Sequence, residues 1–281
     1  MRIQDASRIF SSVQLQAIAR GDMSFVQKIA SKLDLSITTS DQLTLERVFE
    51  DIFSRMLKGY RNEYVFKNRL IESVFLKKYA NSDATLITEL RVGRSVADAV
   101  LVNGSSTCFE IKTEYDSLSR LPEQISSYRK LFDKIVVIAA ESHIQNLLEQ
   151  VPGDIGLSLL TKNGALKVIR RPTDHSSERI DTAVLTSTLR LKELEKLTQS
   201  LTREKLPSSN IEVYQFCNDV IANADPHKVR QGFRNVLKAC RKQNTELLSN
   251  VPKCLKNALV SYSFTTKELN GLLSHLKFPI D

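Results

Sequence analysis

The chain has 281 residues, of which 42% are hydrophobic and 26% charged, and its formal net charge at pH 7 is +8. This composition is typical of a soluble globular protein with one sizeable core, and no low-complexity tract interrupts it. The longest uninterrupted apolar run, Ile135 to Ala140, is far too short to span a bilayer, so no membrane partner is expected. The excess of positive charge favours polyanionic partners.

The N-terminus and the cysteines both favour a cytoplasmic protein. The first twenty residues mix polar and apolar side chains at helical spacing and contain no signal-peptide core. The four cysteines are scattered along the chain without paired CxxC spacing, which predicts reduced thiols rather than a disulfide framework or a structural zinc site.

The chain begins with a stretch that is helical throughout. Residues 1–59 are predicted to form a helical N-terminal region without chemistry of its own, because apolar residues recur there at three- and four-residue steps. The same pattern continues over 60–80, where it marks the start of a second region. That helix carries two acids, Glu63 and Glu72.

Alternating and β-branched stretches then predict a sheet. The expected order is three strands, a helix, a strand, a short helix and a closing hairpin, which describes an α/β fold with a mixed sheet flanked by helices. The expected elements are strands at 85–90, 95–102 and 106–112, a helix at 118–132, a strand at 134–140, a helix at 143–150, and a hairpin of 156–161 with 166–171.

A polar stretch after Arg171 reads as a linker, and the chain from about Thr182 onward reads as wholly helical. The expected helices there include 185–201, 226–242 and 245–262. The predicted domains are therefore a helical N-terminal region at 1–59, an α/β core at 60–171 and a helical C-terminal domain at 182–281.

The C-terminal region holds a concentration of basic residues. Between Pro226 and Lys256 there are eight Lys and Arg against one acid. Four of the eight recur at steps of four, four and three along one predicted helix, which favours a surface that tracks nucleic-acid phosphates, although a solvated helix face explains the stripe nearly as well. The four residues are Arg230, Arg234, Lys238 and Arg241.

Three ionisable residues occur in the otherwise apolar strands at 95–102 and 106–112. Asp98 lies between two alanines, and Glu110 and Lys112 are two residues apart, so they point to the same side of their strand. A strict two-residue turn at Asn103 and Gly104 would separate the two acids. Convergence therefore requires a three-residue connection or one β-bulge, which would set Asp98 opposite Glu110.

The order of these residues resembles the PD-(D/E)XK nuclease superfamily, in particular a poorly characterised bacterial family. The matching segments are EYVFKN, RVGRSVAD, FEIKTEYDSLSRLPEQISSY and FDKIVVIA, within 60–171. The resemblance implies a restriction-endonuclease-like fold in which Asp98, Glu110 and Lys112 form the signature. It also implies a helical acid, with Glu63 as the candidate and Glu72 and Glu89 in reserve. Gln124 and Tyr128 match a Gln-x-x-x-Tyr extension, and Ala97 stands where the motif usually has Pro.

These residue types suit a magnesium site. Mg²⁺, or Mn²⁺ in its place, prefers hard oxygen ligands, which the carboxylates of Asp98 and Glu110 and the carbonyl of Ile111 would supply, with Glu63 as a further ligand. Lys112 would orient the attacking water and steady charge on the phosphate. Gln124 would fix a water or a carboxylate, and Tyr128 would contact the DNA backbone.

The sequence thus predicts a metal-dependent nuclease that hydrolyses phosphodiester bonds, with DNA as the expected substrate, in repair or in bacterial or phage defence against foreign DNA. The alternatives are a catalytically silent nucleic-acid-binding protein and a protein-interaction module on a nuclease fold. The helical ends leave a protein partner open, and a homodimer is also left open.

Overall fold

The structure is a computed structural model that describes residues 1–33, 35, 42–79 and 82–280, and it divides into two compact units. We call them the helical unit (Met1–Lys78, Thr161–Leu166 and Asn244–Asp281) and the sheet unit (Tyr79–Leu160 and Lys167–Gln243), and describe each by itself. The division differs from the predicted domain boundaries, because the helix near 60–80 groups with the N-terminal helices and the C-terminal helices split at Gln243.

The helical unit is built from amphipathic helices whose apolar faces meet in its interior. In the longest of them, Leu45–Gly59, Val48, Phe49, Ile52 and Met56 recur at three- and four-residue steps and are fully buried. The unit contains α1 (Ile3–Ala6), η1 (Ser7–Phe10), α2 (Ser12–Ala19), α3 (Ser24–Lys32), α4 (Leu45–Gly59), α5 (Glu63–Leu70), the π-helical η2 (Ile71–Leu76), α6 (Lys77–Tyr79), α13 (Thr245–Asn250), η4 (Lys253–Leu255), α14 (Lys256–Ser261) and α15 (Thr266–His275). In the described part of the chain, no helix has the length and apolar character that a bilayer crossing needs.

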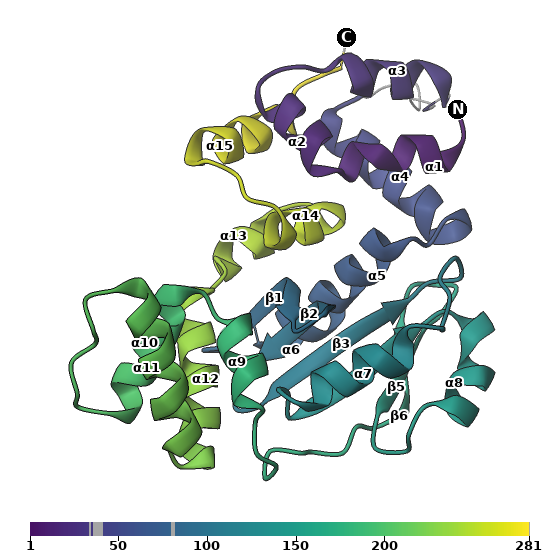
Figure 1. The fold of residues 1–281 in the computed structure, drawn as a ribbon. Helices are drawn as coiled ribbons and strands as arrows, with labels where there is room; N and C mark the ends of the chain where they lie inside the picture. Colours follow the sequence, from purple (N-terminus) through teal and green to yellow (C-terminus); the bar gives the residue numbers. More distant parts are fainter. Residues whose placement is uncertain (34, 36–41, 80–81, 281) are drawn as a thin grey trace. The chain divides into compact units, whose positions relative to one another are not determined.

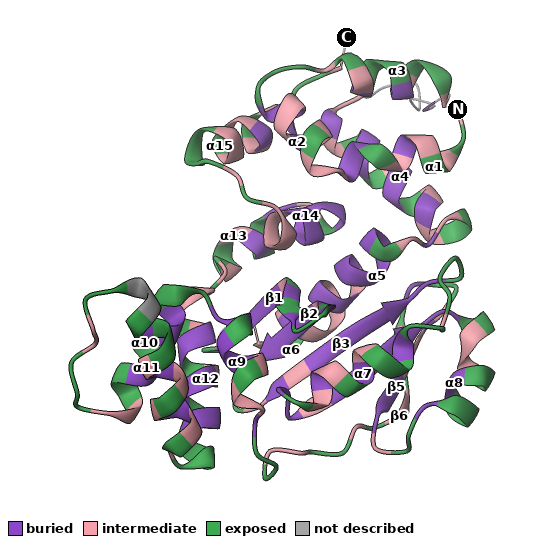
Figure 2. Ribbon diagram, in the orientation of Figure 1, coloured by how far each residue is buried: buried purple, intermediate pink, exposed green. Residues whose placement is uncertain are grey.

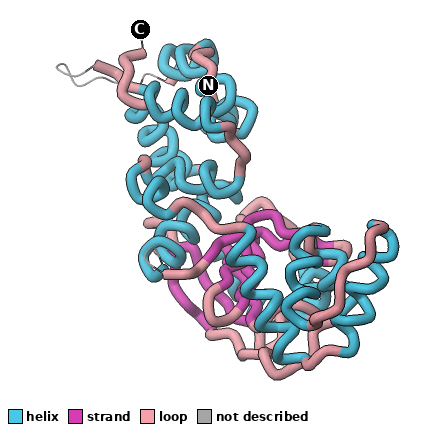
Figure 3. The backbone as a smooth tube through the Cα atoms, turned by 90° about the vertical axis from the view of Figure 1, so that its left-hand side faces the viewer, coloured by secondary structure: helices cyan, strands magenta, loops and turns pink. Residues whose placement is uncertain are grey.

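The sheet unit contains six strands in the spatial order β1-β2-β3-β4-β5-β6. The first three pair antiparallel, whereas β4 pairs parallel with both β3 and β5, so the sheet is mixed. Figure 1 draws the strands as arrows, and Figure 3 shows the strands in magenta. The strands are β1 (Thr85–Val92), β2 (Ser95–Val102), β3 (Ser106–Lys112), β4 (Lys134–Ala139), β5 (Gly156–Leu160) and β6 (Leu166–Arg170).

Helices cover the sheet and enclose its core. The central strands β3 and β4 are buried along almost their whole length, as expected of strands packed on both faces. Figure 2 shows β3 mostly in the purple of buried residues. The helices of this unit are α7 (Leu121–Arg129), η3 (Glu141–His143), α8 (Ile144–Gln150), α9 (Thr182–Thr188), α10 (Leu191–Leu201), α11 (Asn210–Asn223) and α12 (Pro226–Cys240). The prediction of an α/β fold, with a mixed sheet flanked by helices and with helical N- and C-terminal regions, is confirmed.

Two helices that the sequence predicts as continuous are interrupted. The predicted helix at 185–201 is α9 and α10, because Arg190 takes an extended conformation and opens α10 with a capping box to Glu193. The predicted helix at 245–262 divides into α13, η4 and α14 around Pro252, which cannot donate the hydrogen bond that a helix interior requires.

Candidate active site

The connection between β2 and β3 decides whether the two acids converge. Val102 pairs with Ser106 and Ala99 with Phe109, so Asn103–Ser105 is a three-residue connection, as predicted. This register continues to Asp98 opposite Glu110. The ladder itself ends one residue earlier, and the backbone N–H of Ile111 donates instead to Asp98 Oδ2 at 2.6 Å. The two strands therefore stop pairing where the acids lie, and a carboxylate takes the place of a strand carbonyl.

A second irregularity lies across β2 on β1. Thr88 pairs with Ala99 and Leu90 with Ala97, and the intervening pair, Glu89 and Asp98, is skipped. Glu89 has a φ of 54°, in the left-handed region that non-glycine residues rarely adopt. Such strain and local bending recur next to functional sites.

The irregularity at Glu89 changes which face of the strands is buried. Ile87 and Leu90, three residues apart, pack into the same hydrophobic cluster, although a regular strand would place them on opposite faces. Glu89 is exposed and Asp98 half-buried, and their carboxylates offer oxygens within 4.8 Å of each other. The bend therefore lets two acids converge at the surface while the apolar residues on either side remain in the core.

The left-handed backbone at Glu89 should lower the stability of the folded protein, which a substitution can test. We expect Glu89→Gly to raise the free energy of unfolding by about 1 kcal/mol, because relief of the strained φ outweighs the extra freedom of glycine in the unfolded chain. Urea denaturation measures the effect, and Thr88→Gly, on the regular backbone next to it, is the matched control that should lower stability. Loss of stability in both variants would contradict the strain.

Glu110, Lys112, Gln124 and Tyr128 form one buried network. Lys112 Nζ donates to Glu110 Oε1 at 2.8 Å and to Gln124 Oε1 at 2.9 Å. The Tyr128 hydroxyl lies 2.7 Å from Glu110 Oε2 and 2.8 Å from the carbonyl oxygen of Val96. Glu110 and Lys112 are only 2% and 5% exposed. The Gln-x-x-x-Tyr spacing on α7 thus brings both side chains to the acid and the lysine of β3.

Burial raises the pKa of Tyr128 well above its ordinary value, and the neighbouring Cys108 and the carboxylates of Glu110 and Asp98 raise it further. Burial, with the same two carboxylates, also raises the pKa of the Cys108 thiol. Tyr128 therefore stays protonated and able to donate to Glu110.

The predicted role of Tyr128 needs correction. Its side chain is 0% exposed, with its hydroxyl held between Glu110 and the β2 backbone, so it cannot contact a DNA backbone as the sequence analysis expected. Its position fits a residue that holds the carboxylate of Glu110 in place. Gln124 lies in the same network, where its amide oxygen accepts a hydrogen bond from the ammonium group of Lys112 instead of fixing a water or a carboxylate.

The backbone of Ile111 faces the two acids. Ala140 N donates to the Lys112 carbonyl, so Lys112 directs its backbone groups toward β4. Successive residues of a strand alternate in this respect, and the Ile111 N–H points toward β2, as its bond to Asp98 shows. The Ile111 carbonyl lies on the same edge of β3, as a third ligand for a shared cation would require.

The donor set fits a hard divalent cation. Two oxygens on one Mg²⁺ lie about 3 to 4 Å apart, a separation that a small side-chain rotation of Glu89 and Asp98 would reach. An ionised carboxylate has about four acceptor positions. Glu110 uses two of them for Lys112 and Tyr128, so it can accept a further partner without releasing either. A metal between Glu89 and Asp98 would be held by these two carboxylates and by the Ile111 carbonyl, and Glu110, which does not lie within 4.8 Å of both acids, would join them by a side-chain shift.

The helical acids belong to the other unit. Glu63 opens α5, where its carboxylate pairs with Lys67 at 2.5 Å, and Glu72 pairs with Arg69 at 2.6 Å. The assignment of Glu63 as a metal ligand stays a prediction. Glu89, an alternative candidate for this third acid, lies in the sheet unit next to Asp98.

The basic stripe of α12 is engaged within the sheet unit. Arg230 is 3% exposed and, with Arg234, binds the fully buried Asp133, while the guanidinium of Arg241 makes two hydrogen bonds to Glu193 at 2.6 and 2.7 Å. A cation committed to a buried carboxylate is not available to phosphate. The geometry argues against the predicted phosphate-binding role of Arg230, Arg234 and Arg241, and Lys238 also has a carboxylate partner, Asp83, at 2.8 Å.

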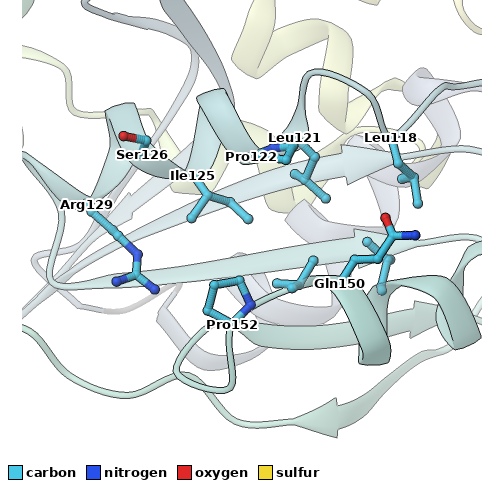
Figure 4. Close-up of a pocket in the computed structure, with 10 residues that line it drawn as sticks. Leu118, Leu121, Pro122, Ile125, Ser126, Arg129, Gln150 and Pro152 are labelled. Atoms are coloured by element: carbon cyan, nitrogen blue, oxygen red, sulfur yellow. The ribbon is translucent and has the colours of Figure 1, made fainter.

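The other side of α7 lines a half-open apolar pocket of about 280 Å³ (Figure 4). Leu121 and Ile125 on α7 face Gln150 and Pro152 across it. Arg129 at one end is paired with Asp154 at 2.6 Å, so the charge there is already neutralised. The pocket is lined by Leu118, Leu121, Pro122, Ile125, Ser126, Arg129, Leu147, Gln150, Val151 and Pro152. Nothing in its lining continues the chemistry of the acid cluster.

Fold and site together define an α/β protein with a mixed sheet and an acid–lysine network on its central strands. The chain belongs to the family described as Bacteriophage P4 protein cII, whose model matches residues 56–263. It is 31% identical over 166 residues to Protein cII of Enterobacteria phage P4, which covers 57% of this chain and 60% of that protein.

A structural comparison gives a likeness too weak to carry an argument. A protein of unknown function from Silicibacter pomeroyi matches with a TM-score of 0.29 and 13% identity, over 38% of this chain and 69% of that one. The names of these relatives state no activity. None of these likenesses establishes a nuclease family.

Proposed function

We propose that this protein is a metal-dependent nuclease of the PD-(D/E)XK type that hydrolyses phosphodiester bonds in DNA in the cytoplasm. The observation that carries the proposal is the row of Glu89, Asp98 and Glu110 across three neighbouring strands, with Lys112 bonded to the last of them. Two of these acids are accessible at the surface, and the sheet pairing is interrupted beside them. The formal charge of +8 supports a polyanionic substrate.

Each residue has a role that follows from its contacts. Asp98, Glu110, the Ile111 carbonyl and Glu89 would hold Mg²⁺ or Mn²⁺, which supplies Lewis-acid activation of the phosphate and of a water molecule when bound. Lys112 uses two of its three N–H groups on Glu110 and Gln124, and the third can donate to a phosphate oxygen or to the attacking water. Gln124 and Tyr128 hold Lys112 and Glu110 in position.

One observation favours a second candidate, a catalytically silent nucleic-acid-binding or protein-interaction module. Glu110 is almost fully buried, and each of its oxygens already has a partner. A fold that had lost catalysis could keep such a pair for stability alone. The exposed Glu89 and the half-buried Asp98 bring carboxylate oxygens within 4.8 Å of each other at the surface, where a divalent cation could reach them, and this favours the nuclease.

The test is incubation of the purified full-length chain with labelled linear, circular and single-stranded DNA, in EDTA and in Mg²⁺ or Mn²⁺. We expect cleavage only with a metal ion. Mn²⁺ binding, followed by calorimetry without DNA, gives a second readout that does not depend on turnover. A folded protein that neither binds Mn²⁺ nor cleaves any of these substrates would favour the silent module.

A further inference from the structure

The loop that follows β3 carries an exposed aromatic residue, Tyr115. Tyr115 is 57% exposed and lies three residues after Lys112. Three residues span at most about 10 Å, so the Cα atoms of Tyr115 and Lys112 lie no farther apart than that. Among the described residues of the sheet unit, Tyr115 and Tyr214 are the large aromatic side chains that are exposed.

The backbone that carries Tyr115 is held firmly. Asp116 Oδ2 accepts from the backbone N–H and from the hydroxyl of Thr113, at 2.8 and 2.6 Å. The Asp116 N–H donates to the Thr113 carbonyl, and that same carbonyl lies 2.9 Å from His143 Nε2. The exposure of Tyr115 therefore belongs to a fixed turn rather than to a loose loop.

A second exposed apolar group lies at this end of the sheet. Val96 is 36% exposed, and the β2–β3 register, continued past its last pair, sets it opposite Lys112. Its carbonyl shares the Tyr128 hydroxyl with Glu110, which places this part of β2 next to the network. Val96 therefore adds exposed apolar surface at this end of the sheet, on the face opposite to the one where Ser95 meets Ser127 of α7.

We infer that Tyr115 is a stacking platform for an unpaired nucleobase, and that the substrate is single-stranded DNA or the unwound end of a duplex. This inference rests on the proposed function, since it assigns the substrate class of the same site. Inside a duplex each base stacks on its neighbours and its faces are closed to a protein ring. A single strand leaves those faces open, and an aromatic side chain binds them with little regard for sequence.

The experiment measures binding apart from cleavage. The anisotropy of a short labelled oligonucleotide, as a single strand and as a blunt duplex of the same sequence, is titrated with the full-length protein in EDTA. The proteins are wild type, Tyr115→Ala, Tyr115→Phe and the matched control Tyr214→Ala, whose ring lies on α11 and is 43% exposed.

Tyr115→Ala should weaken single-strand binding by about 5- to 100-fold, the range typical of one base–aromatic stack. Its duplex binding should stay within about twofold of wild type, and Tyr115→Phe and Tyr214→Ala should behave as wild type. Unchanged single-strand binding by Tyr115→Ala, or equal loss for both forms of DNA, would overturn the inference.

The outcome is separable from that of the nuclease assay. If the protein cleaves DNA but Tyr115→Ala binds single strands as wild type does, the proposed function stands and the stacking role of Tyr115 is refuted. If the protein cleaves no DNA but needs Tyr115 for single-strand binding, the stacking role stands and the nuclease function is refuted.

Discussion

Asp98→Asn should abolish metal-dependent DNA cleavage, with a loss of at least about 100-fold, while the free energy of unfolding changes by less than about 1 kcal/mol. The asparagine carbonyl can still accept from the Ile111 N–H, so the local structure is kept. The variant lacks the negative charge that a hard cation requires. Cleavage rate, Mn²⁺ affinity and urea denaturation together measure the expected result.

Asp83→Asn is the matched control for Asp98→Asn. Asp83 is an exposed acid of the same unit, and the hydrogen bond from Lys238 and the charge of that lysine hold the pKa of its carboxyl below its ordinary value. Its loss should leave cleavage and Mn²⁺ binding unchanged. Equal activity of Asp98→Asn and wild type would remove Asp98 from the catalytic site and, with it, the main support for hydrolysis.

Lys112→Met should destabilise the protein by about 3 to 5 kcal/mol, because it leaves Glu110 buried without its cation. The double variant Glu110→Gln, Lys112→Met should recover at least about 2 kcal/mol of that loss, since no uncompensated charge remains in the core. Urea denaturation at neutral pH measures the wild type, Lys112→Met and the double variant, and Glu110→Gln alone completes the double-mutant cycle.

The burial of Glu110 and Lys112 affects how the activity of variants at these positions can be interpreted. Because Glu110 and Lys112 are buried, an alanine substitution at either residue should lower stability as well as activity. Activity of these variants should therefore be compared only where denaturation shows them folded. A single Lys112→Met variant as stable as wild type would show that the pair is solvated rather than buried.

Much of the fold follows from local patterns in the chain. Strand β2 and strand β3 have the bounds that alternation and the Asn103–Gly104 signal predict, and the three-residue connection follows from the demand that Asp98 and Glu110 share a side. The interruptions before Arg190 and at Pro252 were missed, because amphipathic periodicity continues across them while the backbone breaks.

The candidate site was predictable in its residue types and only in part in its geometry. Asp98, Glu110, Lys112 and Gln124 could be chosen because charged or amide groups in buried or motif positions need a reason to be there. The left-handed backbone of Glu89 could not be predicted from the sequence, because a positive φ is not typical of glutamate. The same lack of signal hid the bend that brings this acid to Asp98.

By itself, the sequence determined the element types, the order of the strands along the chain and the spacing that puts acid, lysine, glutamine and tyrosine on facing elements, because periodicity and turn chemistry act over a few residues. Only the tertiary structure decided which charged side chains are paired inside the protein. Arg230 of α12 meets Asp133, and Arg241, which follows that helix, meets Glu193, in both cases from positions far apart in the chain. Tyr128 is buried against Glu110 rather than exposed to solvent. Burial and long-range pairing depend on how distant segments pack, and a pattern of neighbouring residues does not contain that information.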